Sequence, residues 1–389
     1  MRIKLFSVTR LYSGCSRYNV LVLLIFFVFG VYIFYHLTTE QGVVGMRLAL
    51  YRLTNSDAVI NSGELVREEQ VGVHALRHND RKKSESCRPV NKFVFIKPEK
   101  TGGSTVSTIL FRYGMKNNLV AALKPRWTHI CVIKMDKEKD RLGIVYYNCS
   151  DFPGYDYLCQ HIQTYNRAEL NRIVHDATYM TIIRSPYTHL KSKFYFSRQH
   201  LNLSMSPDPF AIYLKDIEKT AMKDEQLRKE TNSFHFRFGL NIAANESFAL
   251  EDFRRFDDEI DLVMIMEYMD ESLVLLKKLM CWDFDDMVYH SCKVHQNYQP
   301  PTTEAMRDII TKVSRADIRL YNYFNRTFWE KVENYDGDFE ADLEEFRSVQ
   351  KAANAKCETD ENSVYCTNLQ KDVHELAKVV YDEQAKWMC

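Results

Sequence analysis

The sequence has no excess of charge of either sign, because 52 basic and 52 acidic side chains give a formal net charge of zero. Proteins that bind nucleic acid along its length usually carry a strong basic excess, so we expect no nucleic-acid partner. A small polyanion such as a nucleotide can still be held by a local basic cluster. The sequence also contains no internal repeat and no low-complexity tract. Its hydrophobic residues amount to 46%, which is enough for a sizeable core.

Two common ligand-binding patterns are missing as well. No two cysteines have the C-x-x-C spacing of a zinc site, and no cysteine–histidine spacing matches one, so we expect no metal cofactor. The nucleoside-triphosphate loop G-x-x-x-x-G-K-[ST] is also absent. Without it, the lysine and hydroxyl that serve Mg²⁺ and a γ-phosphate are not in place, which argues against a kinase or an ATPase.

Charged side chains are absent from residues 18–37, an apolar run about as long as the ~20-residue helix that crosses a bilayer. Four basic residues precede this run: Arg2, Lys4, Arg10 and Arg17. By the positive-inside rule, residues 1–17 would form a cytosolic tail and the bulk of the chain would be lumenal. A cleaved signal peptide is the alternative, but its apolar region is normally shorter. We therefore expect a single-pass type II signal-anchor at 18–37, followed by a lumenal stem over 38–90.

A lumenal domain can form disulfides and carry N-linked glycans. Nine of the ten cysteines follow the expected anchor, and because nine is odd, at least one should be free or pair with another chain. Cys357 and Cys366 are a candidate disulfide clip near the C-terminus. Four N-x-S/T sequons are candidate glycosylation sites: Asn148, Asn202, Asn245 and Asn325.

Short apolar runs alternate with helical stretches over residues 91–335. The runs that suit buried strands are Lys92–Lys97, Tyr157–Ile162, Ala177–Ile183 and Ile260–Met266. The helical stretches include Ser104–Tyr113 (ending at Gly114), Tyr187–Gln199 and Asp270–Met280. This alternation predicts an α/β domain with a central parallel sheet. Residues 336–389 are charged and helical in character, and we interpret them as a C-terminal extension of the same domain.

The sharpest motif joins a strand, a glycine loop and a helix between Phe95 and Thr105. Such a turn aims backbone N–H groups and a helix N-terminus at an anion. Gly102 and Gly103 permit a close approach, and Lys100 adds a positive charge. The hydroxyl groups of the loop belong to Thr101, Ser104 and Thr105. An ordinary polar turn between a strand and a helix remains the alternative at this point.

A second motif follows another predicted strand. Arg184 comes at the end of the run Ala177–Ile183, and Ser192 lies about two turns into the following helix. A guanidinium gives a bidentate contact to phosphate, and a serine hydroxyl adds a further donor. Together with the glycine loop, the pair describes two phosphate sites on one sheet edge. A nucleotide phosphorylated at both its 5′ and 3′ positions requires such an arrangement.

These motifs carry a family resemblance. Lys97–Thr105 resembles the 5′-phosphosulfate loop of sulfotransferases, and Arg184 with Ser192 resembles their 3′-phosphate motif. More narrowly, most of residues 92–335 is similar to the galactose-3-O-sulfotransferase family, and the segments that carry the likeness are Lys100–Gly114, Glu267–Trp282 and Tyr321–Trp329. The resemblance implies a P-loop-like three-layer fold, the co-substrate 3′-phosphoadenylyl sulfate, a galactose-terminated glycolipid or glycan as acceptor, and residence in the Golgi membrane.

The same resemblance suggests which side chains do the chemistry. Lys100 would stabilise the leaving group, where a positive charge is most effective once water is excluded. A sugar hydroxyl is a weak acid, so a general base should take its proton. The candidates are His161, whose position resembles a Cys-Asn-His segment of the family, and Glu99. The family pattern has a histidine immediately before the loop lysine, and this sequence departs from it with Glu99.

Several other side chains near these motifs invite a functional role. Tyr268, Trp282 and Trp329 could stack on a sugar, but their periodic apolar neighbours favour core packing. Lys97 either supports the site or is the solvated end of its strand. His189 is interpreted as a packing or solvent-facing residue.

Two other functions stay open from the sequence. The acceptor could be a uronic acid or hexosamine of a glycosaminoglycan, which a long basic groove would favour and the zero net charge mildly opposes. Alternatively, the chain could be a non-catalytic lumenal binding protein of the same fold, with Glu99 as the mark of lost chemistry. The joint presence of Lys100, Arg184 and Ser192 argues against this second alternative.

Overall fold

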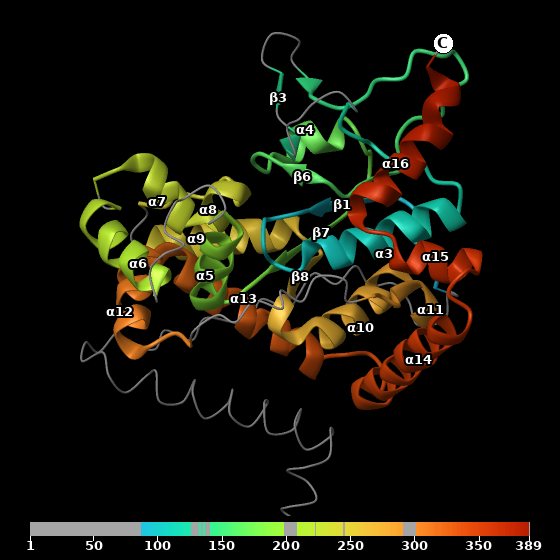
Figure 1. Cartoon of the computed structure of the whole chain (residues 1–389). Helices are drawn as coiled ribbons and strands as arrows, with labels where there is room; N and C mark the ends of the chain where they lie inside the picture. Colours follow the sequence, from blue (N-terminus) through green and yellow to red (C-terminus); the bar gives the residue numbers. More distant parts are fainter. Residues whose placement is uncertain are drawn as a thin grey trace, which may run out of the picture. The chain divides into compact units, whose positions relative to one another are not determined.

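The computed structural model describes residues 87–125, 132–133, 135–136, 141–197, 208–221, 223–243, 246–290 and 301–388. These residues belong to one compact unit, Ser84–Cys389, whose helices and strands are shown in Figure 1. No helix within the described ranges is both long and apolar enough to span a bilayer. The anchor predicted at 18–37 lies outside those ranges, as does the tail before it.

A four-stranded parallel sheet lies at the centre of the unit. Its strands stand in the order β5 (Tyr157–Leu158), β1 (Phe93–Ile96), β7 (Thr178–Ile183) and β8 (Leu262–Ile265). Every neighbouring pair is parallel. All four residues of β1 are buried, as expected for an inner strand that is covered on both faces. The prediction of an α/β domain with a parallel sheet is confirmed.

One predicted strand is wrong in its extent. The run Tyr157–Ile162 divides into β5 and β6 (His161–Ile162), and β6 pairs with β2 (Val132–Ile133) in a separate two-stranded sheet. The chain leaves the central sheet between the two strands, at Cys159. The carbonyl oxygen of Cys159 accepts a hydrogen bond of 2.7 Å from the Ser107 hydroxyl, so a helix takes up the backbone bond that a neighbouring strand would have made.

Helices make up most of the remaining described structure (Figure 1). Between β1 and the end of β8 they are α3 (Gly103–Lys116), α4 (Arg167–Asn171), α5 (Pro186–Ser197), α6 (Pro209–Thr220), α7 (Glu225–Thr231), α8 (Ser233–Phe238) and α9 (Glu246–Glu259). After β8 come η2 (Met266–Tyr268), α10 (Met269–Met280), α11 (Phe284–Met287), α12 (Glu304–Val313), α13 (Arg315–Glu333), α14 (Phe339–Thr359), α15 (Val364–Gln370), α16 (Val373–Gln384) and η3 (Ala385–Trp387). A short antiparallel pair, β3 (Met135–Asp136) with β4 (Arg141–Leu142), precedes β5.

The helix predicted to end at Gly114 continues to Lys116. Gly114 serves packing and does not terminate the helix. A Cβ atom at this position would lie 2.5 Å from the Tyr157 hydroxyl oxygen, which no real contact allows. The glycine therefore lets α3 lie directly on β5.

The tryptophans considered as sugar-stacking residues lie in the core, which confirms the packing interpretation. Trp282 is buried, and its ring stacks on Tyr113 with 3.4 Å between the ring centroids. Trp329 is also buried and meets Tyr268 edge to face. Such aromatic pairs add roughly 0.5–1.5 kcal/mol beyond their area burial.

Two disulfides occur among the described residues. Cys87 pairs with Cys281 across 194 residues of sequence, which ties the segment before β1 to the end of α10. In the chain-entropy account, closing so long a loop removes on the order of 5 kcal/mol from the unfolded state, as an upper figure. Cys357 pairs with Cys366, which confirms the predicted clip. Cys159 is free and buried, so the expectation of at least one free cysteine holds.

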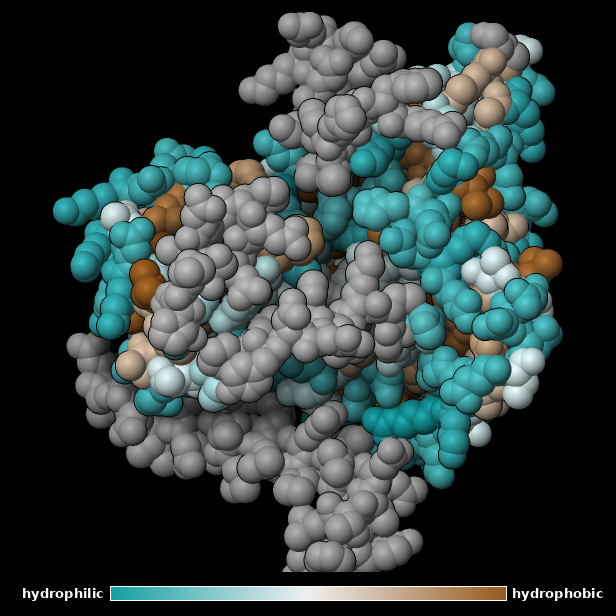
Figure 2. Space-filling model, in the orientation of Figure 1, coloured by the Kyte–Doolittle hydropathy of each residue, from teal (hydrophilic) through white to brown (hydrophobic). Residues whose placement is uncertain are grey.

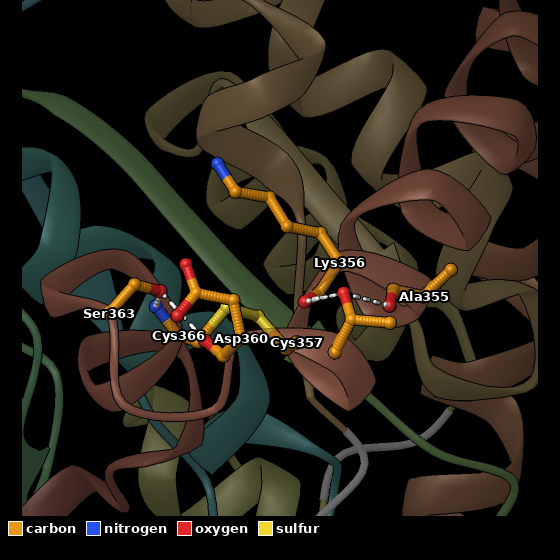
Figure 3. The surroundings of a disulfide bond; sticks show 7 residues. Ala355, Lys356, Cys357, Asp360, Ser363 and Cys366 are labelled. Atoms are coloured by element: carbon orange, nitrogen blue, oxygen red, sulfur yellow. Dashed lines mark hydrogen bonds between the residues drawn. A yellow bond between two sulfur atoms is a disulfide. The ribbon is translucent and has the colours of Figure 1, made fainter.

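The Cys357–Cys366 disulfide joins the end of α14 to the start of α15 (Figure 3). Ser363 begins α15 by accepting the backbone N–H of Cys366, and its own hydroxyl donates to the Asp360 carbonyl. The C-terminal helices then pack back onto the sheet-bearing part of the unit: α14 contacts α10, and α16 contacts α3.

On the face shown in Figure 2, most of the described surface is hydrophilic, and hydrophobic residues appear there in small separate areas. This is the ordinary surface of a globular domain, in which a lone exposed apolar side chain needs no special role. An exposed aromatic residue therefore becomes informative only through the site to which it belongs.

Candidate functional site

Three of the predicted site segments and one further residue, Glu267, lie where the four strands of the central sheet end. The loop Lys97–Gly102 follows β1, His161 follows β5, Arg184 follows β7 and Glu267 follows β8. Because all four strands are parallel, these positions share one edge of the sheet. The strand order places the loop between His161 on one side and Arg184 on the other. In open α/β sheets, ligands bind at this edge.

The glycine loop contains two residues with left-handed backbone conformation, which glycine adopts readily and lysine only rarely. Lys100 and Gly102 have φ angles of 60° and 78°, in the left-handed region. A Cβ atom on Gly102 would also lie 2.8 Å from the Met269 methyl carbon, so a larger residue would be both strained and crowded. Thr101 closes the turn with a 3.2 Å hydrogen bond from its hydroxyl to the Pro98 carbonyl. This bond is one of the contacts that hold the loop in shape.

Helix α3 begins immediately after the loop, at Gly103, and no side chain caps its N-terminus. The first N–H groups of a helix have no partner inside the helix, and the aligned peptide dipoles favour an anion there. The first turn of α3 also contains no acidic residue, which would compete with an anion. Ser104 and Thr105 stand in this turn. The local structure therefore suits a phosphate group, as the sequence predicts.

Arg184 contacts the loop directly. Its Nη1 donates a 3.2 Å hydrogen bond to the Lys100 carbonyl, and its Nε donates a 2.8 Å bond to the Thr188 hydroxyl. A guanidinium has five N–H groups. Since these two contacts use one group each, three groups remain for a ligand within the described part of the chain. The two motifs predicted to bind opposite ends of one nucleotide therefore meet at the same place.

Glu267, which the sequence analysis did not assign to the site, braces the Arg184 segment. Its Oε1 accepts hydrogen bonds from the Ser185 backbone N–H at 3.0 Å and from the Thr188 hydroxyl at 3.2 Å. Burial lowers the pKa of Arg184, and the Glu267 carboxylate offsets part of this effect. Ser192 lies four residues after Thr188 on α5, so the two side chains occupy the same face of that helix.

The ammonium group of Lys100 lies 4.2 Å from the centre of the Phe196 ring, at the end of α5. Phe196 is 62% exposed, yet it belongs to this site through its contact with Lys100. A cation over an aromatic face gains about 0.5–1 kcal/mol at an exposed position. The sequence analysis missed Phe196.

His161 is held against the other side of the loop. Its Nδ1 lies 2.8 Å from the Lys97 carbonyl oxygen, and because a carbonyl can only accept, Nδ1 carries the proton. In the neutral ring, Nε2 then has a lone pair. Burial and the Lys97 ammonium lower the pKa of His161 to about 4, although the Glu99 carboxylate acts in the opposite direction. A neutral imidazole with an available Nε2 has the form that a general base requires.

Glu99 is committed to an ion pair. Its carboxylate binds the Arg237 guanidinium through two hydrogen bonds, one of which joins Nε to Oε2 at 3.2 Å. Burial would raise the pKa of Glu99, but the charge and hydrogen bond of Arg237 outweigh that effect and lower it. The Glu99 carboxylate is therefore already engaged by Arg237, which leaves His161 as the candidate with a lone pair on Nε2.

The structure decides between the alternative roles given above for Lys97 and His189. Lys97 is only 5% exposed, which excludes the solvated strand end and leaves the supporting role. His189 is buried, stacks on Phe234 and donates through Nε2 to the Glu99 carbonyl at 2.8 Å. Its packing interpretation is confirmed, and it also supports the loop. Within the described ranges, no cluster of His, Cys, Asp and Glu could hold a metal ion.

The predicted glycosylation sites differ in their surroundings. Asn148 is exposed in a loop, whereas Asn325 lies within α13 and its side-chain oxygen is buried without a hydrogen-bond partner. Asn202 and Asn245 lie outside the described residues. Glycosylation at the four positions stays a prediction.

Comparison with known proteins adds independent information. The model of the galactose-3-O-sulfotransferase family matches residues 20–374. Galactosylceramide sulfotransferase from Mus musculus is 29% identical over 269 residues, which cover 64% of this chain and 59% of that protein. Galactose-3-O-sulfotransferase 2 from Mus musculus is 25% identical, covering 69% of this chain and 70% of that protein. Galactose-3-O-sulfotransferase 3 from Homo sapiens is 30% identical, covering 63% and 58%. The match thus spans less than two thirds of the length of the first of these relatives.

Proposed function

Because the chain belongs to the galactose-3-O-sulfotransferase family, we propose that it transfers a sulfuryl group from 3′-phosphoadenylyl sulfate to a hydroxyl, O3, of galactose. The acceptor would be a galactose-terminated glycolipid or glycoprotein glycan. Membership of the family supports carbohydrate sulfotransferase activity. The observation that carries the proposal is the 3.2 Å contact between Arg184 Nη1 and the Lys100 carbonyl, because it brings the two phosphate-binding motifs together.

The residues present suit such a donor. The uncapped N-terminus of α3 can hold the 5′-phosphate through the backbone of Gly102 and Gly103 and the hydroxyl groups of Thr101, Ser104 and Thr105. On the other side of the loop, three N–H groups of Arg184 remain for a ligand within the described part of the chain. Ser192 lies on the same helix face as Thr188, so both Arg184 and Ser192 can hold the 3′-phosphate.

Proton removal falls to His161. Its Nε2 would take the proton of the acceptor hydroxyl while the acceptor oxygen forms its bond to sulfur and the bond between sulfur and the phosphate oxygen breaks. Lys100 would stabilise the negative charge that develops on that phosphate oxygen. The nucleotide then leaves as adenosine 3′,5′-bisphosphate. Glu99, the alternative base, is less suited because its carboxylate is paired with Arg237.

A Golgi location as a single-pass type II protein is part of the proposal. It is supported by the uncharged run at 18–37 with basic residues before it. The disulfides Cys87–Cys281 and Cys357–Cys366 suit an oxidising compartment such as the secretory lumen.

The test is sulfate transfer from radiolabelled donor to a panel of galactosides, with glycosaminoglycan chains as a second panel. The wild type should label terminal galactose, and Lys100→Ala should not. Lys116→Ala is the matched control, because Lys116 lies on α3 with its side chain 59% exposed and pairs with Asp286. Equal labelling by wild type and Lys100→Ala would refute the mechanism. Donor binding without transfer to either panel would favour the non-catalytic alternative.

A further inference from the structure

Arg237 joins two segments of the site that are far apart in the sequence. It stands on α8 and binds the Glu99 carboxylate of the glycine loop through Nε and Nη2. Its Nη1 donates a 2.7 Å hydrogen bond to the carbonyl of Gln163, two residues after His161. One guanidinium therefore links the loop that carries Lys100 to the strand that carries His161.

We propose that Arg237 is a positioning residue that clamps the phosphate-binding loop to the His161 segment through Glu99. The consequence for catalysis depends on the sulfotransferase function proposed above, since the clamp would fix the position of the bound donor relative to the base. Misplacing reacting groups by as little as 1 Å can cost about 100-fold in rate. The departure from the family pattern at Glu99 then has a structural purpose, because a histidine there could not form this ion pair with two hydrogen bonds.

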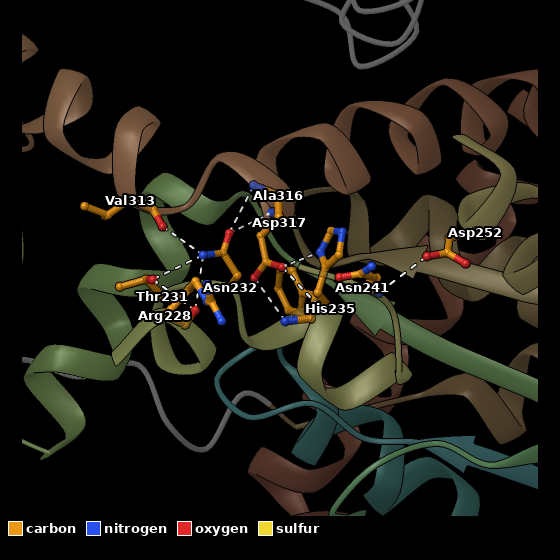
Figure 4. A network of polar contacts seen from close by, with 10 residues as sticks. Arg228, Thr231, Asn232, His235, Asn241, Asp252, Val313, Ala316 and Asp317 are labelled. Atoms are coloured by element: carbon orange, nitrogen blue, oxygen red, sulfur yellow. Dashed lines mark hydrogen bonds and ion pairs between the residues drawn. The ribbon is translucent and has the colours of Figure 1, made fainter. Parts of the chain in front are cut away.

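The helix that presents Arg237 is itself fixed. Asp317, at the start of α13, accepts hydrogen bonds from the backbone N–H groups of Phe234 and His235, at 3.0 and 3.1 Å, and from His235 Nδ1 at 3.0 Å (Figure 4). The side chains of His235 and Asp317 are only 1% and 2% exposed. Asn232 completes the network by accepting the backbone N–H groups of Ala316 and Asp317. Arg237 thus extends from an anchored helix, as a clamp requires.

The charges around His161 make the pKa of this residue sensitive to the Arg237–Glu99 ion pair, which ordinary packing would not do. Three ionisable groups face its ring: Lys97 at the end of β1, Glu99 in the loop and Arg237 on α8. Lys193 on α5 acts on Glu99 in turn. Removing Arg237 deletes a positive charge and leaves Glu99 unpaired, so the pKa of His161 should rise. Removing the charge of Glu99 leaves Arg237 unpaired. The pKa of His161 should then fall or stay unchanged.

The experiment is an NMR titration of the full-length chain labelled with ¹³C at histidine Cε1, with His161→Gln to assign the resonance. Arg237→Met should raise the pKa of His161 by roughly one unit, and Glu99→Gln should not raise it. The double variant should lie between the two single variants. Arg255→Met is the matched control, because Arg255 forms an exposed ion pair with Asp252 on α9.

Two results would overturn the clamp: a rise of equal size in both single variants, or a shift in Arg237→Met no larger than that of Arg255→Met. Kinetics give a second readout. Arg237→Lys keeps the charge but cannot reach both segments, so it should lower kcat at least tenfold while the KM for the donor changes less than threefold. Unchanged kcat in this variant would also contradict the proposal. The titration needs no enzymatic activity, so it tests the clamp even if the proposed reaction fails.

Discussion

Replacing Arg184 should abolish the ability of the protein to distinguish a nucleotide with a 3′-phosphate from one without it. In the structure, the Nε and one Nη1 group of Arg184 are occupied by Thr188 and by the Lys100 carbonyl. The remaining N–H groups can give a phosphate two charge-assisted hydrogen bonds, each worth about 1.5–3 kcal/mol. Arg184 is half-buried, so water screens part of this energy. We therefore expect a loss of about 3 kcal/mol, or roughly 100-fold in Kd.

The assay is calorimetric titration of the wild type and variants with adenosine 3′,5′-bisphosphate and, separately, with adenosine 5′-phosphate. The wild type should bind the bisphosphate much more tightly, and Arg184→Ala should bind both ligands with similar, weak affinity. Arg184→Lys should lie between them, because lysine keeps the charge but loses the planar fork. Thr188→Val removes a partner of Arg184 and is expected to weaken bisphosphate binding less than fivefold.

The reasoning is refuted if Arg184→Ala weakens the two ligands by the same factor. Arg184 would then act only by supporting the loop through the Lys100 carbonyl. A double variant with Ser192→Ala separates the two phosphate contacts further. Since both side chains would hold the same phosphate group, their effects on bisphosphate binding should be less than additive.

Three further predictions concern proton transfer, stability and modification. If His161 is the base, kcat/KM should stay nearly constant from pH 7 to about 5, because its lowered pKa of about 4 keeps it neutral there; an acid limb near pH 6.5 in a pH–rate profile would contradict this. Asp317→Ala should lower the free energy of unfolding by about 1–3 kcal/mol, since buried donors lose their acceptor. A loss below about 1 kcal/mol in denaturant titration would contradict this prediction. Mass spectrometry of protein made in the secretory pathway of a eukaryotic cell should find glycan at Asn148 and none at Asn325, whose side-chain oxygen is buried. A glycan on Asn325 would be inconsistent with its place in α13.

The local elements of the site could be predicted from short stretches of sequence. The buried run before Pro98 and the two glycines specify a strand, a turn and a helix, and the structure contains all three. The strand before Arg184 and the helix after it follow from the same kind of pattern. By contrast, the run Tyr157–Ile162 could not reveal its division, because β5 and β6 pair with different strands, β1 and β2, that lie far away in the sequence.

Residues that act through distant partners could not be predicted. Arg237 stands 138 positions from Glu99, and nothing near it in the sequence marks it as a partner of the loop. Phe196 has only the ordinary appearance of an aromatic residue near a helix end. Glu267 lay within a segment that carries the family likeness, and that was the one available signal for it.

The sequence by itself predicted the alternation of strands and helices, the glycine loop after β1 and the position of Arg184 after β7, because each of these features depends on residues that are near one another in the chain. Local backbone preferences and burial periodicity act over that range. Tertiary structure alone decided that Arg184 reaches the Lys100 carbonyl, that His161 Nδ1 meets the Lys97 carbonyl, and that Glu99 pairs with Arg237. These facts depend on the order of strands in the sheet, since only parallel pairing brings the ends of β5, β1, β7 and β8 to one edge.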